Sequence, residues 1–237
     1  MKLSHCLVGC ALLACAGVAQ AAVITVANGS FETGVAPAGA GQGNDAWSPL
    51  PASAPGVWEW TANASSPYGV YKVDTTAHPP QTGAHFYTAA DGNYVLNLGA
   101  AADGSTPKQI TQALSYTVAA GDVFTLDFYV AKGRQTNSGG SGTLTASILV
   151  DTTTIGTDAT IATGDITGNT TDTWYHKTVT GTATGTGTLS ISFAPNATAG
   201  GSPWLDKVAM SVVAVPEPTS LSLLALSGLA LMRRRRA

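Results

Sequence analysis

The sequence predicts an all-β fold, a jelly-roll β-sandwich formed by a single domain. Apolar and polar residues alternate with a period of two over most segments between the two ends of the chain. Clusters of Gly, Pro, Asn and Ser separate these segments. No segment in residues 22–213 shows a helical period. About ten short strands at this spacing are typical of two antiparallel sheets packed face to face.

The alternation is clearest in two consecutive segments. From Ile110 to Val118, every second residue beginning with Ile110 is placed on one face. From Val123 to Val130 the even-numbered residues are apolar, whereas Thr125, Asp127 and Tyr129 face the other way. The remaining expected strands are residues 23–26, 57–61, 69–73, 94–98, 144–150, 174–180, 189–193 and 205–212.

Residues 1–21 have the organisation of a signal peptide. Lys2 precedes an apolar stretch over residues 7–18, which ends at the small residues of Ala19-Gln20-Ala21. We expect signal peptidase to cut there, so that the mature chain begins near Ala22. Cys10 and Cys15 lie in sequences that loosely resemble lipidation sites, so a lipoprotein remains an alternative. All three cysteines lie in this leader, so the mature domain forms no disulfide.

Residues 214–237 have the organisation of a sorting tail. The apolar stretch 219–232 is shorter than the roughly 20 residues that span a bilayer, but flanking arginine side chains can extend it. We therefore expect a single C-terminal apolar helix, with the arginines on the cytoplasmic side. The motif before it consists of Val215, Pro216, Glu217 and Pro218, and the cluster after it of Arg233, Arg234, Arg235 and Arg236.

This order of motif, helix and cluster resembles the PEP-CTERM sorting signal of Gram-negative bacteria that make extracellular polysaccharide. The resemblance implies export to the cell envelope, surface or extracellular matrix, and processing near the motif by a membrane-embedded exosortase. A plain tail anchor is the alternative. The three expected parts are thus the signal peptide 1–21, the jelly-roll domain 22–213 and the sorting tail 214–237.

The charge of the domain argues against nucleic acid as a partner. Charged residues make up 11% of the chain, and residues 22–213 carry six basic and thirteen acidic side chains, a net charge of −7. Phosphate binding needs basic patches, and the sequence has none in this region.

A second resemblance covers nearly the whole domain. It rests on Asn28 to Glu32, Trp58 and Trp60, residues 92–98, residues 110–112, and Trp204 to Val208. Their order is similar to that of the galactose-binding-like jelly rolls, which include xylanase-type carbohydrate-binding modules. It implies weak binding of glycans such as extracellular polysaccharide.

The same resemblance implies a structural calcium ion held by Glu32 and Asp206. Calcium takes six to eight oxygen ligands, so backbone carbonyls near Asn28 and Gly29 would have to contribute. Lys207 departs from the family pattern, which has a second acidic residue at this position. The alternative is that Glu32 and Asp206 meet solvent at the rim of a sheet.

Aromatic side chains are the expected contacts for a sugar, because a flat ring buries the apolar face of a pyranose. Trp47, Tyr68 and Tyr87 lie in or beside loops and are the candidate ligand-binding residues. Trp174 and Trp204 lie at the starts of expected strands, so we expect them to be packing residues.

No catalytic motif is present. The sequence has no G-x-S-x-G elbow, no H-E-x-x-H and no P-loop. We therefore expect a non-catalytic protein. Two alternatives stay open: a structural or adhesion protein of the matrix without a small ligand, and a glycoside hydrolase with an unrecognised pair of carboxylates.

Overall fold

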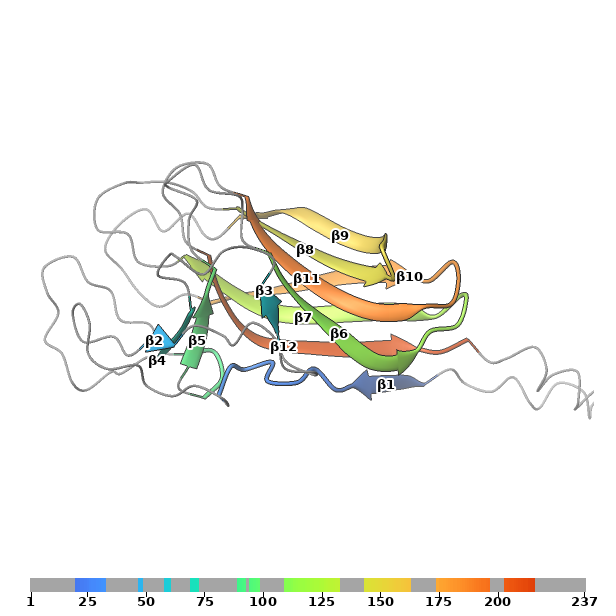
Figure 1. Cartoon of the computed structure of the whole chain (residues 1–237), viewed down its shortest axis with the longest axis horizontal. Helices are drawn as coiled ribbons and strands as arrows, with labels where there is room; N and C mark the ends of the chain where they lie inside the picture. The colour runs from blue at the N-terminus through green and yellow to red at the C-terminus, as the bar shows by residue number, and fades with distance from the viewer. Residues whose placement is uncertain are drawn as a thin grey trace, which may run out of the picture.

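The protein folds as an all-β sandwich (Figure 1). The computed structural model describes residues 20–32, 47–48, 58–60, 69–72, 89–92, 94–98, 109–132, 143–162, 174–196 and 203–215. Every regular element within these ranges is a β-strand, and every pairing between the strands is antiparallel. The predicted fold class is therefore confirmed. Residues 1–19 of the expected signal peptide and the expected tail helix lie outside the described residues.

The larger sheet has seven strands in the order β10-β7-β12-β5-β4-β2, and β1 also pairs with β12. Its strands are β1 (Ala21–Ile24), β2 (Trp47–Ser48), β4 (Gly69–Lys72), β5 (Tyr94–Asn97), β7 (Val123–Lys132), β10 (Tyr175–Thr182) and β12 (Pro203–Val213).

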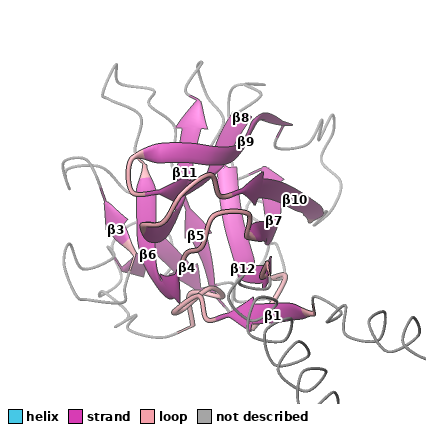
Figure 2. Ribbon diagram, turned by 90° about the vertical axis from the view of Figure 1, so that its right-hand side faces the viewer, coloured by secondary structure: helices cyan, strands magenta, loops and turns pink. Residues whose placement is uncertain are grey.

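The smaller sheet has five strands in the order β3-β6-β11-β8-β9. Its strands are β3 (Glu59–Trp60), β6 (Ile110–Thr117), β8 (Thr143–Val150), β9 (Thr153–Ala162) and β11 (Thr188–Asn196). Figure 2 shows the two sheets as stacked layers. The layers approach each other where β9 runs beside β10, and there Gly156 and Gly181 let the two backbones touch, because a Cβ on either would meet the other strand.

The core lies between the sheets and follows the predicted alternation. Phe124, Leu126, Phe128 and Val130 of β7 are fully buried, whereas the residues between them are partly exposed. Trp58 is also fully buried. Its ring lies 5.8 Å from that of Phe31 and 5.9 Å from that of Phe193, so an aromatic cluster fills the space between the two sheets.

The first and last strands of the domain lie side by side. β1 pairs with β12 so that Ala21 is opposite Val213 and Ile24 is opposite Met210. The expected leader and the expected sorting tail therefore join the domain at the same end, which is the right-hand end in Figure 1.

Two strands were not expected from the sequence. All residues of β9 whose burial is described are exposed or half-buried, so this edge strand has no buried face and no apolar alternation. β2 has only two residues and pairs with β4. The sequence pattern detects a strand only where one face is buried, and neither strand gives that signal.

In the part of the chain that the structure describes, no helical segment has the length and hydropathy needed to cross a bilayer.

Candidate functional site

The segment from Asn28 to Glu32 forms a tight turn beside the core. Asn28 and Phe31 both adopt positive φ angles, 51° and 56°, and the Phe31 N–H donates a 3.1 Å hydrogen bond to the Asn28 carbonyl. The turn directs the Phe31 ring into the core, where it is fully buried. Gln112 of β6 holds the preceding residue: its side-chain amide pairs with both the N–H and the carbonyl of Ala27, at 2.9 and 2.8 Å.

A β-bulge in β12 places Asp206. The register against β7 shifts between Asp206 and Ala209, and Lys207 within the bulge has a φ of 50°. The bulge directs the Val208 N–H to the carbonyl of Gly29, at 2.9 Å. A Cβ on Gly29 would collide with the Val208 carbonyl, so only glycine fits at this contact.

The Asp206 side chain is fully buried and accepts backbone hydrogen bonds on both oxygens. Oδ1 accepts from the N–H of Lys207 at 2.7 Å, and Oδ2 from the N–H of Asp91 at 2.9 Å. Burial raises the pKa of Asp206 to about 7, and the charge of Asp91 acts in the same direction, against the backbone hydrogen bonds. The alternative that Asp206 meets solvent at a sheet rim is therefore wrong.

Glu32 binds the backbone just after Asp91, at the first residue of β5. Its Oε1 accepts a 2.7 Å hydrogen bond from the N–H of Tyr94, three positions after Asp91. The Asp91 carboxylate in turn accepts a 2.7 Å hydrogen bond from the hydroxyl of Ser30. Glu32 and Asp206 thus bind the backbone N–H groups of Tyr94, the first residue of β5, and of Asp91, which precedes it.

No group of three or more His, Cys, Asp or Glu side chains suited to a metal ion occurs among the described residues. Two carbonyls near the expected calcium position also have protein partners. The Asn28 carbonyl accepts from the Trp58 indole N–H at 3.2 Å as well as from Phe31, and the Gly29 carbonyl accepts from Val208. The calcium ion stays a prediction, and its supposed ligands Glu32 and Asp206 both act as backbone anchors.

A second group of side chains lies on the outer face of the larger sheet, and we call it the outer-face cluster: Asp127, Tyr129, His176, Thr178 and Lys207. β10 and β7 place His176 directly opposite Tyr129, and Thr178 opposite Asp127. Asp206 is opposite Tyr129 on the other side, so the bulge brings the next residue, Lys207, to the same ring.

The outer-face cluster combines rings with charges. The imidazole of His176 lies 5.1 Å from the Tyr129 ring at an angle of 31°, and the ammonium of Lys207 lies 5.4 Å from the centre of that ring. Asp127 Oδ1 is 3.1 Å from His176 Nε2 and accepts a 2.7 Å hydrogen bond from the Thr178 hydroxyl. The His176 and Asp127 side chains are 52% and 39% exposed, so the polar atoms can reach a ligand.

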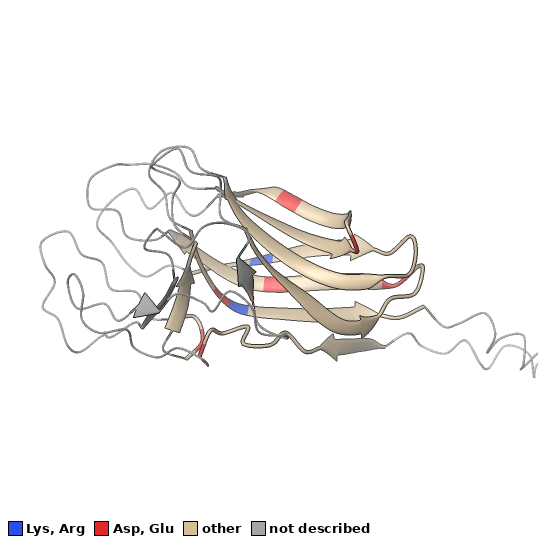
Figure 3. Ribbon diagram, viewed as in Figure 1, with Lys and Arg blue, Asp and Glu red and all other residues tan. Residues whose placement is uncertain are grey.

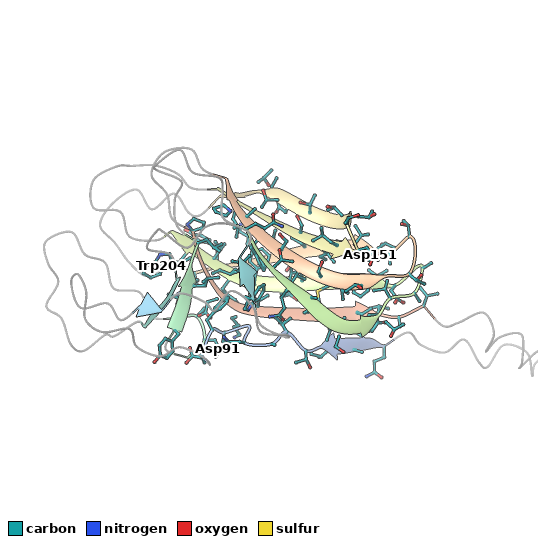
Figure 4. All side chains as sticks on the ribbon, in the orientation of Figure 1. Asp91, Asp151 and Trp204 are labelled. Atoms are coloured by element: carbon teal, nitrogen blue, oxygen red, sulfur yellow. The ribbon has the colours of Figure 1, made fainter. Side chains whose placement is uncertain are left out.

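An apolar cluster continues the same face. Ala131 and Trp204 lie opposite each other on β7 and β12 and pack with Val95 of β5, and Trp174 packs against them. Figure 3 shows how few charged positions the described strands carry, and that those of β7, β10 and β12 lie near one another. Figure 4 places Trp204 and Asp91 toward the end of the sandwich opposite Asp151. Val95, Ala131 and Trp204 are buried, so the part of this face that a ligand can reach is the outer-face cluster. Its rings and polar groups suit a ligand that has both an apolar face and hydroxyl groups.

The residues of the outer-face cluster were not identified as a site from the sequence. The outward direction of Asp127 and Tyr129 was predicted correctly, but only the pairing of β7 with β10 and β12 shows which residues join them. Trp47 lies in β2, with its side chain outside the described part, and Tyr68 and Tyr87 lie outside the described residues. Their roles stay predictions. Trp204 packs against its neighbours, as expected.

The comparisons with known proteins divide the chain as follows. The HpiC1 cyclase family matches residues 22–211, and the PEP-CTERM protein-sorting motif matches residues 214–236. No curated protein matches the chain. The PEP-CTERM match confirms the predicted sorting signal, and the protein is therefore exported to the cell envelope or surface of a Gram-negative bacterium and sorted by an exosortase.

Several solved cyclases share the fold. The apo form of a cyclase from Fischerella sp. is 18% identical with a TM-score of 0.57, covering 83% of this chain and 98% of that one. The Stig cyclase Fisc from Fischerella sp. TAU, in complex with (3Z)-3-(1-methyl-2-pyrrolidinylidene)-3H-indole, is 16% identical with a TM-score of 0.58, covering 81% and 98%. A cyclase from Fischerella sp. TAU in complex with 4-(1H-indol-3-yl)butan-2-one is 16% identical with a TM-score of 0.55, covering 82% and 100%. At such identities the likeness shows the fold, and it agrees with a galactose-binding-like jelly-roll ectodomain.

Proposed function

The chain belongs to the HpiC1 cyclase-like family, and we propose that on this family's fold it is a non-catalytic protein of the bacterial surface that binds extracellular polysaccharide through its outer-face cluster. A family fold does not fix the activity of a member, so the site has to carry the argument. The observation that carries it is the position of Tyr129 between His176 and Lys207 on an exposed sheet face.

The chemistry of the cluster supports a polyhydroxylated ligand. A sugar ring can pack its C–H face against the neighbouring rings of Tyr129 and His176, while its hydroxyls bond to Asp127 or Lys207. The protein is exported to a location where such polymers occur. One half-buried aromatic ring with a few polar contacts supports only micromolar to millimolar affinity, because association and side-chain ordering offset most of the gain.

The direct test is affinity electrophoresis of the mature chain in gels that contain the extracellular polysaccharide of the bacterium that exports this protein. We expect retardation that is lost in Tyr129→Ala and kept in Thr180→Ala, since Thr180 is an exposed residue of β10. The glycan should be recovered at its original length, since release of shorter fragments would instead support a hydrolase. Absence of retardation for the unchanged protein would favour a matrix protein without a small ligand.

A second candidate function is a cyclase activity like that named for the solved cyclases that share this fold. The observation that favours it is Asp206, because a carboxyl with a pKa of about 7 can donate a proton at neutral pH. Against it, both Asp206 oxygens hold backbone N–H groups and the side chain is fully buried. Turnover of an indole substrate by the purified protein, abolished in Asp206→Asn, would support this candidate and contradict a purely non-catalytic role.

A further inference from the structure

The chain leaves the domain at a turn organised by Asp122. This carboxylate is 1% exposed and binds both the turn and the exit segment. Oδ2 accepts hydrogen bonds from the N–H of Ala119 at 2.9 Å and from the hydroxyl of Tyr116 at 3.2 Å. Oδ1 accepts from the N–H of Val215, two residues after the end of β12, at 3.2 Å. One buried carboxylate therefore connects the domain to the residue before Pro216.

The turn is itself fixed to the domain. The Gly121 N–H donates to the carbonyl of Ala183 at 2.7 Å, and the Ala183 N–H donates to the carbonyl of Asp122 at 2.9 Å. Ala183 is buried and joins β10 to the turn before β11. Burial and the neighbouring Asp122 charge raise the pKa of Tyr116, so its hydroxyl stays protonated as a donor. The Asp122 carboxylate thus has a fixed position from which it holds Val215.

The exit segment leaves little free chain before the membrane. Only Pro216, Glu217 and Pro218 separate Val215 from the apolar stretch that begins at residue 219. Four residue steps span at most about 14 Å when fully extended. While Val215 is held, the sorting motif therefore begins directly at the surface of the folded domain.

We propose that Asp122 is a positioning residue for sorting, a clamp that holds Val215 on the domain and slows processing of the Pro-Glu-Pro motif. A processing enzyme acts on a segment that has left the folded structure, and its rate then follows the population of the opened form. A hydrogen bond to a carboxylate contributes enough that its loss should raise this population by about tenfold. The fraction of the exported protein in which the clamp at Asp122 is open then sets the rate at which it is processed.

The test follows processing of the full-length chain by pulse-chase labelling in a host that has exosortase. Asp122→Ala should be processed about tenfold faster than the unchanged chain, in line with the loss of a hydrogen bond to a charged group. Asp151→Ala is the matched control. The Asp151 carboxylate also accepts a backbone N–H in a turn, that of Thr188 at 2.8 Å, and its side chain is exposed at the end of the sandwich opposite Trp204 (Figure 4). Its processing rate should stay unchanged.

A lengthened chain separates the clamp from an effect on folding. Six Gly and Ser residues inserted between Val213 and Ala214 keep the motif intact but move Val215 away from Asp122. This chain should be processed fast, and Asp122→Ala should add nothing to its rate. If Asp122→Ala accelerated processing equally in the natural and the lengthened chain, or did not accelerate it in the natural chain, the proposal would be overturned.

A second variant covers the case in which Asp122→Ala does not fold. Val215→Pro removes the donated N–H without changing the turn. It should accelerate processing in the natural chain and leave the lengthened chain unchanged. The same rate change in both chains would mean that the motif itself had been altered, and it would count against the clamp.

Discussion

The backbone N–H of Asp91 donates a 2.9 Å hydrogen bond to Oδ2 of Asp206, which lies 115 positions later in the chain. This contact joins the segment before β5 to the bulge of β12 and leaves the carboxylate inside the protein. Asp206 therefore links two segments that are far apart in the sequence, and the first predictions concern this residue.

Replacing Asp206 should destabilise the domain. Asp206→Ala leaves the N–H groups of Asp91 and Lys207 without their acceptor and empties a fully buried position, which should lower the free energy of unfolding by about 2–4 kcal/mol. Thr154→Ala, at an exposed position of the edge strand β9, should change it by less than about 0.5 kcal/mol. Urea unfolding of the mature chain measures both. An Asp206→Ala protein as stable as the unchanged one would show that these hydrogen bonds contribute little.

Stability should depend on the protonation of Asp206. Its pKa in the folded state, about 7, is higher than the roughly 3.9 of an unfolded aspartate, so the folded state binds more protons between these values. The contribution of Asp206 to the free energy of unfolding is then fully present below about pH 4. It falls by about 4 kcal/mol in total as the pH rises to about 7, and it is constant above that.

Thermal unfolding between pH 4 and 8 tests this dependence when compared with Asp206→Asn. The difference between the two melting curves isolates the carboxyl from the other acidic residues. We expect the stability of the unchanged protein to fall more steeply than that of the variant between pH 4 and about 7, and the two curves to run parallel above that. Parallel curves over the whole range would mean that the pKa of Asp206 is not raised.

Calcium should abolish this pH dependence if Glu32 and Asp206 share an ion. A cation beside the carboxylate favours its charged form, so the stability of the calcium-loaded protein should no longer fall as the pH rises through 7. At a calcium concentration 100 times its dissociation constant, the free energy of unfolding should rise by about 2.7 kcal/mol. Equal melting temperatures with calcium and with chelator would eliminate the ion.

The contact between Gly29 and the bulge should tolerate no side chain. Gly29→Ala would push its Cβ into the Val208 carbonyl and displace the hydrogen bond from the Val208 N–H, and we expect a loss of about 2–4 kcal/mol. Gly185→Ala is the matched control, because a Cβ there has no atom within 4 Å. Its effect should stay within about 0.5 kcal/mol. Similar losses for the two variants would show that the close approach at Gly29 is not what requires glycine.

The sequence predicts much of the fold because burial leaves a pattern in it. The alternation of β7 identified both the buried Phe128 and the outward Tyr129 before any pairing was known. β9 escaped detection since an exposed edge strand is under no constraint to alternate. The resemblance to carbohydrate-binding modules also identified Glu32 and Asp206 as neighbours, and both side chains bind backbone N–H groups at or just before the start of β5.

The contacts of Asp206 and of the outer-face cluster depend on strand pairing between distant segments, which no local sequence pattern reveals. Asp91 has no motif of its own, and its role follows from a contact across the domain with Asp206. Likewise, Lys207 reaches the Tyr129 ring because of the bulge in β12. In an unbroken strand, successive side chains alternate between faces, so Lys207 would point to the face opposite that of Tyr129. Strand register and bulges arise from long-range pairing, so the outer-face cluster is visible only in three dimensions.

The central claim is that the outer-face cluster binds polysaccharide, and isothermal titration of the mature protein with that polymer tests it most directly. The unchanged protein and Thr180→Ala should bind alike in the micromolar to millimolar range, whereas Tyr129→Ala should bind at least about tenfold more weakly while remaining folded at the temperature of the titration. Equal affinity of Tyr129→Ala and the unchanged protein would contradict the account.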